Sequence, residues 1–354
     1  MNTREGNELL ANPEVVKGIG QKIDNHGSDE DNSPTLRVSY CDHIWSNLAG
    51  YRIFNIELSV RMGALHEVVW SLSGFELAGF DLTGEEFHLI SRLVYEKFGI
   101  NLGEQKRMLV IERLQKELRR GGFSSFKEYY DHVTQDTTGQ ALLTMIDRIS
   151  TNHTFFFREK DHFDLLTAEI LPKILQKLPG AGQNLRFWSA GCSSGEEPYT
   201  LAMTINEYLG PKINIIGVDI LATDISVTAL AKASRGVYAD TETAQISSGL
   251  KNRYFMKSGD GTWAVKQSLK KMILFRRLNL MRQTYPFKNK FHVIFCRNVM
   301  IYFDVPTRTA LLERFCACLE PGGYLFLGHS ESLGRSSELL KYIKPAVYQK
   351  VVRG

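Results

Sequence analysis

A glycine-containing loop is the first candidate for chemistry in this sequence. The segment WSAGCSSGEEP (residues 188–198) carries Gly191 and Gly195, followed at once by Glu196 and Glu197. Glycines let a backbone approach a ligand closely, and the first turn of the helix expected after them has free N–H groups. The spacing does not match the Gly-x-Gly-x-x-Gly fingerprint of dinucleotide sites. The two carboxylates favour a positively charged ligand over a pyrophosphate, although glutamates that only stabilise a helix start would look the same.

An acidic residue that ends the next expected strand is a second candidate. Asp224 lies in the segment ATDI, and a carboxylate in this place can accept hydrogen bonds from both hydroxyls of a ribose. Asp219, five residues earlier, competes for this role, and either residue could simply cap a helix. The loop and the acid together favour a ligand that contains a nucleoside.

The segment TNHTFFFRE (residues 151–159) combines polar groups with three consecutive phenylalanines. Asn152, Thr154 and Arg158 do not share a helical face, so their pattern indicates a lid held rigidly by an aromatic anchor. Packing between two domains would explain the same phenylalanines without any ligand.

The segment CRNVMIYFD (residues 296–304) follows an expected strand. Arg297 and Asn298 fall where a doubly wound sheet places its ligands, and Tyr302 lies just beyond them. Strand-end capping by ordinary surface residues is the alternative for this segment taken alone.

Helices and strands must position these four segments, and the first secondary structure that the sequence predicts is a group of helices. Thr83-Gly-Glu-Glu has the form of a capping box, and apolar residues then repeat at helical spacing. A second helix is expected over 104–120, with shorter helices over 124–134 and 139–150. Residues 79–150 are therefore expected to form a small all-helical domain.

The rest of the chain alternates strand and helix. Strands are expected at 185–190, 213–223, 291–296 and 324–327, and helices at 198–209, 227–233 and 306–319. This alternation predicts a doubly wound, mostly parallel α/β sheet over 151–354, which binds ligands beyond the carboxyl ends of its strands. A Ser-Gly-Asp-Gly turn between β-prone runs predicts a small antiparallel insertion at 250–277.

The N-terminal part and the composition set further limits. Residues 1–78 are an extension without an assigned role, and the polar, acidic stretch 24–34 within it is expected to be disordered. The net charge is +4, from 43 basic and 39 acidic residues, which excludes a histone-like chain. No apolar run approaches the ~20 residues of a membrane span, and the N-terminus lacks a signal pattern. With 5 cysteines, an odd count that fits a reducing compartment, we expect a cytoplasmic protein without membrane insertion.

Taken together, the four segments resemble the glutamate methyltransferases of chemotaxis receptors, the CheR family. The resemblance spans Phe80 to Lys350 and rests on TNHTFFFRE, FWSAGCSSGEEPY, ATDIS, LNL, FCRNVMIYFD and PGGYLFLGHSE in family order. It implies a helical receptor-facing domain, then a Rossmann-like methyltransferase domain that uses S-adenosyl-L-methionine and releases S-adenosyl-L-homocysteine. The implied activity is the methyl esterification of glutamates on the cytoplasmic helical bundle of methyl-accepting chemoreceptors.

The resemblance also implies roles for single residues. Arg158 and Tyr302 would form the catalytic pair, and no metal is implied. The implied cofactor-binding residues are Asn152, Thr154, Arg158, Glu197, Asp224 (rather than Asp219), Asn279, Leu280, Arg297 and Asn298. Because the attacking glutamate is ionised at neutral pH, the reaction needs no general base, and positioning should supply most of the catalysis.

A basic stripe is expected to meet the receptor. At about 100° per residue, Lys106, Arg113, Lys116 and Arg120 fall on one side of the second helix, while apolar residues cover another. An ordinary solvated face is the alternative, but a glutamate-rich partner favours complementary charge. The turn at 257–262 looks shorter than in family members that capture a receptor's C-terminal pentapeptide, so tether binding is not expected.

Two other functions stay open at this point. A methyltransferase for nucleic acid or a small molecule would need a basic, aromatic-lined surface or an enclosed apolar pocket, and the sequence shows neither. A non-catalytic module that senses the cofactor is disfavoured by the presence of Arg158 and Tyr302. The chain is expected to act as a monomer and to bind no nucleic acid.

Overall fold

The computed structural model describes residues 80–178, 184–331, 333 and 338–352, together with three short strands nearer the N-terminus. The stretch 24–34, for which disorder was expected, lies outside the described residues. The chain divides into two compact units, Met1–Gly79 and Phe80–Gly354, and every candidate site residue belongs to the second. Within the described ranges, none of the helices has the length and apolar content of a membrane-crossing segment.

The described part of the first unit is a small sheet. Strands β1 (Thr35–Leu36), β2 (Glu57–Arg61) and β3 (Val69–Ser71) pair antiparallel in the order β1-β2-β3. Periodicity predicted no strand here, because runs this short leave too few residues to show an alternation. The sheet adds no functional assignment for this part of the chain.

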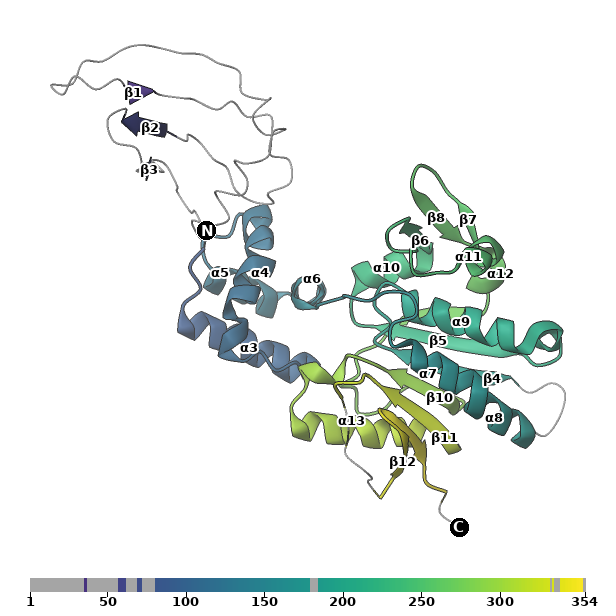
Figure 1. The fold of residues 1–354 in the computed structure, drawn as a ribbon. Coiled ribbons are helices and arrows are strands. Elements are labelled where there is room, and N and C mark those ends of the chain that lie inside the picture. Colours follow the sequence, from purple (N-terminus) through teal and green to yellow (C-terminus); the bar gives the residue numbers. More distant parts are fainter. Residues whose placement is uncertain are drawn as a thin grey trace. The chain divides into compact units, whose positions relative to one another are not determined.

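The second unit begins with the helices that the sequence predicts (Figure 1). They are α3 (Gly84–Phe98), α4 (Arg107–Gly121), α5 (Phe126–Gln135) and α6 (Gln140–Ile149), with the short 3-10 helix η1 (Glu104–Lys106) before α4. The predicted capping box is present, because the Thr83 hydroxyl accepts from the Glu86 N–H at 3.2 Å and Glu86 accepts from the Thr83 N–H at 2.9 Å. Buried Phe87, Leu114 and Ile146 belong to one core that these helices share.

A seven-stranded sheet forms the centre of the remaining residues, in the order β12-β13-β11-β10-β4-β5-β9. The strands are β4 (Leu185–Ala190), β5 (Val218–Asp224), β9 (Ile273–Arg277), β10 (Phe291–Cys296), β11 (Leu319–Leu327), β12 (Leu340–Lys344) and β13 (Val347–Lys350). Strands β11, β10, β4, β5 and β9 run parallel, and β13 and β12 pair antiparallel at one edge. The prediction of a mostly parallel, doubly wound sheet is confirmed.

Helices cover both faces of this sheet, and successive residues of β4 show the division. Phe187 packs into a core that also holds buried residues from the helices before and after β4, whereas Trp188 packs into a core with Phe315 of α13. The helices are α7 (Lys160–Leu165), the π-helix η2 (Leu166–Ile170), α8 (Leu171–Lys177), α9 (Glu196–Leu209), α10 (Val227–Arg235) and α13 (Val305–Cys318). This two-sided cover leaves the carboxyl ends of the parallel strands as the place for a ligand.

A second, small antiparallel sheet lies beside the large one (Figure 1). Its order is β6-β8-β7, from β6 (Val237–Ala239), β7 (Phe255–Lys257) and β8 (Thr262–Val265), with α11 (Ser248–Tyr254) and α12 (Gln267–Lys270). The expected insertion is therefore present, but the bounds 250–277 do not match it. The range omits β6 and includes β9, which belongs to the edge of the large sheet.

Two predicted boundaries also differ from the structure. Strand β5 starts at Val218 instead of residue 213, because the short 3-10 helix η3 (Gly210–Asn214) occupies the preceding residues. Strand β11 starts at Leu319 instead of residue 324, so Pro321-Gly322-Gly323 lies inside it. The register there steps from Phe291 to Val293 on β10 but from Leu319 to Tyr324 on β11, so the extra residues bulge out of the ladder.

Candidate active site

A cavity of about 360 Å³ opens beyond the carboxyl ends of β4, β5 and β10. The residues predicted for cofactor binding and catalysis all line it, namely Asn152, Thr154, Arg158, Glu197, Asp224, Asn279, Leu280, Arg297, Asn298 and Tyr302. Asp219 does not line the cavity; it is exposed near the start of β5, where its carboxylate accepts a hydrogen bond from Asn184 at 2.7 Å. Of the two aspartates, Asp224 therefore lines the cavity and Asp219 does not.

The most buried charge in the cavity is the Arg297 guanidinium, whose side chain is 2% exposed. Its Nη1 lies 3.1 Å from Glu197 Oε2, and its Nη2 lies 3.2 Å from Glu159 Oε2. The same guanidinium donates a hydrogen bond to the Arg158 carbonyl. Two carboxylates thus share one cation, which leaves an excess of one negative charge in a region largely shielded from water.

Burial affects the two carboxylates differently. Burial raises the pKa of Glu197, although Arg297 and a hydrogen bond from the Ser189 hydroxyl at 2.6 Å oppose the rise. Burial also works against ionisation of Glu159, but the charge of Arg297 and hydrogen bonds from His329 N–H and Asn298 outweigh it, so the pKa of Glu159 is lowered. Glu159 is therefore the firmer anion, and Glu197 is the one whose charge responds to a ligand or to pH.

Asp224 is held at the end of β5 by backbone donors. Its Oδ2 accepts from the Ser193 N–H at 2.7 Å and its Oδ1 from the Ser226 N–H at 2.9 Å. Burial raises its pKa. The Ser226 hydroxyl accepts from Asn152 Nδ2 at 3.3 Å and also donates to Asp147 of α6, so the helical part of the unit supports this carboxylate.

Close contacts require glycine at positions 191 and 195 of the loop between β4 and α9. Gly191 has φ +86°, and a Cβ there would lie 2.4 Å from Val299 Cγ2. Gly195 has φ +99°, and a Cβ there would lie 2.8 Å from the Ala233 Cβ. Any larger residue would therefore displace a wall of the cavity or the start of α9.

Backbone strain gathers at the same place. Of the non-glycine residues with positive φ in the described ranges, Phe157 (58°), Ser193 (49°) and Asn298 (58°) line the cavity, and Glu159 (52°) pairs with Arg297. Such conformations cost energy and persist where the surroundings enforce them, commonly at functional sites. The strain supports this cavity as the active site.

The helical part of the unit forms one wall of the cavity. The Asn101 N–H donates to the Tyr302 carbonyl at 2.8 Å, and Asn279 Nδ2 donates to the Lys97 carbonyl at 2.7 Å. Lys106 Nζ lies 5.4 Å from the centre of the Tyr302 ring, and burial lowers the pKa of Lys106. Tyr302 is thus held between the sheet and the helices.

The structure separates the four residues of the predicted basic stripe. Lys106 belongs to η1 and lines the cavity, whereas Arg113, Lys116 and Arg120 are exposed along α4 and do not line it. Arg120 also pairs with Glu117 at 2.8 Å. One of the four therefore faces the site, and the other three lie on the outer surface.

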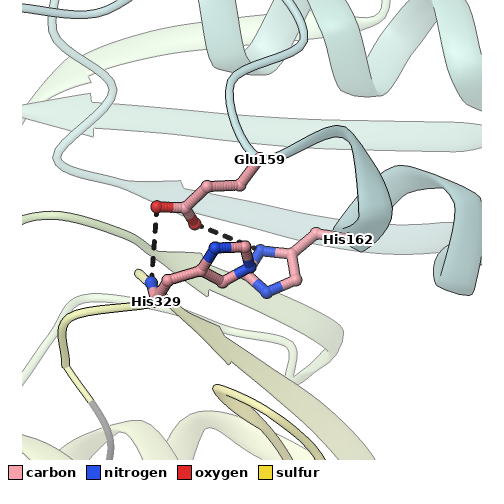
Figure 2. A group of neighbouring side chains, drawn as sticks. All are labelled: Glu159, His162 and His329. Carbon is pink, nitrogen blue, oxygen red and sulfur yellow. Dashed lines mark hydrogen bonds and ion pairs between the residues drawn. The ribbon is translucent and has the colours of Figure 1, made fainter.

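A cluster of three side chains near Arg297 has the atom types of a metal site. Figure 2 shows Glu159, His162 and His329, whose ligand atoms all lie within 4.8 Å of one another. His162 is buried, and its Nδ1 lies 3.5 Å from Glu159 Oε2 (dashed in Figure 2), although neither ring nitrogen makes a hydrogen bond to the described residues. Burial together with Arg297 lowers its pKa to about 4. A divalent cation would have to share Glu159 with the Arg297 guanidinium, which repels it. We interpret the cluster as closely packed side chains in which the His162 imidazole is neutral, and we assign it no metal.

Sequence reasoning missed several residues that support the site. Glu159 follows Arg158 directly in the segment TNHTFFFRE. Its acidic side chain, next to a candidate arginine, was the one feature of the sequence that could have marked it as a site residue. Glu331 ends the segment PGGYLFLGHSE, and its carboxylate accepts backbone hydrogen bonds from Asn298 and Ile301. Neither contact follows from spacing, since each joins residues far apart in the chain.

Comparison with known proteins gives two family models and several relatives. The model "CheR methyltransferase, SAM binding domain" matches residues 152–348, and "CheR methyltransferase, all-alpha domain" matches residues 85–150. The chain is 45% identical to the chemotaxis protein methyltransferase of Borreliella burgdorferi, over 76% of this chain and 95% of that protein. It is 38% identical to a probable chemotaxis protein methyltransferase of Rhizobium etli, over 74% and 98%. It is 37% identical to the chemotaxis protein methyltransferase of Escherichia coli, over 71% and 85%.

Proposed function

The chain belongs to the CheR methyltransferase family, and from that membership we propose that it methylates glutamate side chains of chemoreceptors in chemotaxis. The methyl donor is S-adenosyl-L-methionine, and the product on the receptor is a glutamate methyl ester. The observation that carries the proposal is the cavity, in which residues from four separate segments meet beside the buried group of Arg297, Glu197 and Glu159, which carries an excess of one negative charge. That charge suits a cationic ligand.

The residues of the cavity fit the cofactor in chemical type. Asp224, fixed by two backbone N–H groups, would accept hydrogen bonds from ribose hydroxyls. Glu197, with its pKa raised, would be stabilised as an anion by the positive charge of the ligand. We propose that the remaining cavity residues complete the binding surface, namely Asn152, Thr154, Arg158, Asn279, Leu280, Arg297 and Asn298.

When bound, S-adenosyl-L-methionine supplies a methyl group on a positively charged sulfur. The protein's part is to bring the receptor carboxylate to that carbon in line with the bond that breaks. The carboxylate is already ionised, with an ordinary pKa of about 4.3, so no residue has to remove a proton. Rate enhancement then comes from positioning and from the exclusion of water as opposite charges cancel.

We propose that Arg158 orients the receptor carboxylate. Its Nη1 donates to the His153 carbonyl at 2.9 Å, and its guanidinium lies 5.7 Å from the centre of the Phe155 ring. Both contacts lie within the segment 151–159, so they aim the side chain without committing it to a buried ion pair. A guanidinium held in this way can bind a carboxylate and release the neutral ester.

Tyr302 is the second proposed catalytic residue. Its carbonyl is fixed by Asn101, and Lys106 lies over its ring, so its hydroxyl has a defined place at the cavity. There the hydroxyl would donate a hydrogen bond to the receptor carboxylate or limit its angle of approach. Lys106 adds a positive charge at the same wall and would attract the acceptor.

Two finer points about the partner belong to the same proposal. Arg113, Lys116 and Arg120 would steer the glutamate-rich receptor bundle toward the cavity. We also propose that the enzyme acts as a monomer. Because a short turn joins β7 and β8, we propose in addition that the enzyme does not need the receptor's C-terminal pentapeptide. Methylation of receptor fragments with and without their last five residues tests the second point.

A methyl-transfer assay tests the function directly. Purified chain, labelled S-adenosyl-L-methionine and a receptor cytoplasmic fragment should yield base-labile label on glutamate. Cofactor binding without transfer would instead support a sensing module, and label on nucleic acid or a small molecule would support a different methyltransferase. The same mixture without the chain serves as the control.

A further inference from the structure

The carboxylate of Glu331 is buried and accepts three backbone hydrogen bonds. The residue is 4% exposed and follows β11. Its Oε2 accepts from the Gly328 N–H at 2.6 Å and from the Asn298 N–H at 2.7 Å, and its Oε1 accepts from the Ile301 N–H at 3.2 Å. Hydrogen bonds to an ionised acceptor are stronger than neutral ones, and burial strengthens them further.

Two of the three donors belong to the loop that carries Tyr302, so the carboxylate lies directly against this loop. Asn298 and Ile301 lie on the loop that leaves β10, immediately before Tyr302 in the short 3-10 helix η4 (Met300–Tyr302). Asn298 has φ 58°, a conformation that its surroundings must enforce. Glu331 binds both ends of this loop to the end of β11, although it does not itself line the cavity.

The end of β11 packs closely against the loop that follows β10. A Cβ at Gly328 would lie 2.6 Å from Asn298 Nδ2, 2.9 Å from the Asn298 nitrogen and 2.8 Å from Glu331 Oε2. Contacts this close mean that the loop position depends on the carboxylate and the glycine together. A small change at either residue should move the loop.

We propose that Glu331 is a positioning residue for methyl transfer. By accepting hydrogen bonds from Asn298 and Ile301, it sets the place of the Asn298 side chain at the cofactor and of the Tyr302 hydroxyl at the acceptor. This inference rests on the proposed function, because it acts through residues assigned there. A misplacement of about 1 Å in such groups can cost about 100-fold in rate.

Glu331→Gln tests the inference, because it keeps the size of the side chain but turns one acceptor into an NH₂ group that faces a backbone donor. We expect kcat to fall by about tenfold or more and KM for S-adenosyl-L-methionine to rise several-fold. Glu242→Gln is the matched control, since Glu242 also accepts a backbone N–H, from Ala239 at 2.8 Å, but does not line the cavity. The control should lose stability at most, with kcat and KM unchanged.

A double-mutant cycle with Tyr302→Phe separates positioning from general destabilisation. If Glu331 acts through Tyr302, Glu331→Gln should cost much less in the Tyr302→Phe background than in the wild type. Additive losses in kcat would overturn the inference. Should Glu331→Gln fail to fold, Gly328→Ala disturbs the same contacts with the carboxylate kept, and the same outcomes apply to it.

Calorimetry with S-adenosyl-L-homocysteine keeps this inference distinct from the proposed function. Wild-type chain that neither binds this ligand nor transfers a methyl group would overturn the function itself. Wild-type chain that does both, alongside a Glu331→Gln variant with unchanged kcat and KM, would overturn the positioning role alone.

Discussion

Arg297 and Glu197 form an ion pair of 3.1 Å whose side chains are only 2% and 12% exposed, at the wall of the cavity. Because Arg297 also pairs with Glu159, the pair belongs to a group of three charges with an excess of one negative charge. The position of that charge makes the affinity for a cationic ligand measurable through single substitutions.

Glu197→Gln should weaken binding of S-adenosyl-L-methionine more than binding of S-adenosyl-L-homocysteine. The variant removes the excess negative charge, and only the first ligand carries a positive sulfur. We expect the ratio of the two dissociation constants to change by about tenfold, or about 1.4 kcal/mol. Calorimetry with both ligands measures it, and Glu207→Gln on the exposed side of the same helix is the control. An unchanged ratio would show that the buried charge does not recognise the sulfonium.

Cofactor affinity should fall as the pH falls. Burial raises the pKa of Glu197 and of Asp224, so both protonate at a higher pH than ordinary carboxyl groups and lose the charge that attracts the ligand. The loss should begin above the ordinary range of about pH 4 to 5. Dissociation constants for S-adenosyl-L-methionine across this range measure the effect. Glu197→Gln should flatten the curve, and a curve of wild-type steepness in that variant would contradict the assignment.

Stability should fall with pH because of His162. Burial and Arg297 lower the pKa of His162 to about 4 from the ordinary 6.5. Between these values the unfolded chain binds a proton that the folded chain does not, so the free energy of unfolding decreases as the pH falls, by up to about 3 kcal/mol. Urea unfolding at about pH 7, 6 and 5 measures the slope. His162→Phe should reduce it, and equal slopes would place the titration elsewhere.

Arg158→Ala should lower turnover by about 100-fold or more if the guanidinium orients the acceptor as proposed, and the protein should stay folded because this side chain is not part of a core. Affinity for S-adenosyl-L-homocysteine should change much less than kcat. Arg276→Ala is the matched control, since Arg276 Nη1 also donates to a neighbouring carbonyl at 2.9 Å but does not line the cavity. Normal turnover in Arg158→Ala would remove its proposed role.

Charge reversal on α4 should weaken receptor recognition without affecting the cofactor. Arg113→Glu and Lys116→Glu should raise KM for the receptor fragment several-fold, and added salt should reduce the difference from wild type. Affinity for S-adenosyl-L-homocysteine should stay the same. Lys173→Glu on α8 gives the same change in net charge away from the cavity. If that control raises KM equally, the effect is one of total charge and the stripe has no special role.

The sequence predicted the central strands better than the edge strands. The bounds of β4 and β10 were predicted correctly, since each is a short apolar run bordered by turn residues and buried on both faces. Edge strand β12 was missed and edge strand β9 was assigned to the insertion, because charged residues such as Lys341 and Arg276 break their apolar runs. Strands β6 and β13 are likewise too short to give a clear signal.

The site residues were predictable where a motif ends at a strand. The carboxyl ends of parallel strands lie at the same edge of the sheet. A predicted parallel sheet therefore already implied that Glu197, Asp224 and Arg297 lie close together. The supporting contacts were not predictable. The hydrogen bond between Glu331 and Asn298 joins residues 33 apart, and its existence depends on the close approach at Gly328. Helical spacing likewise could not tell which residue of the basic stripe reaches the cavity.

The hydrogen bonds from Asn101 to Tyr302 and from Asn279 to Lys97 have a consequence for engineering. A chimaera that exchanges α3 to α6 with those of a homologue, in order to redirect the enzyme to another receptor, would also exchange the backbone that holds Tyr302. Grafts should therefore keep the native stretch from Lys97 to Lys106 and replace only the outward residues of α4.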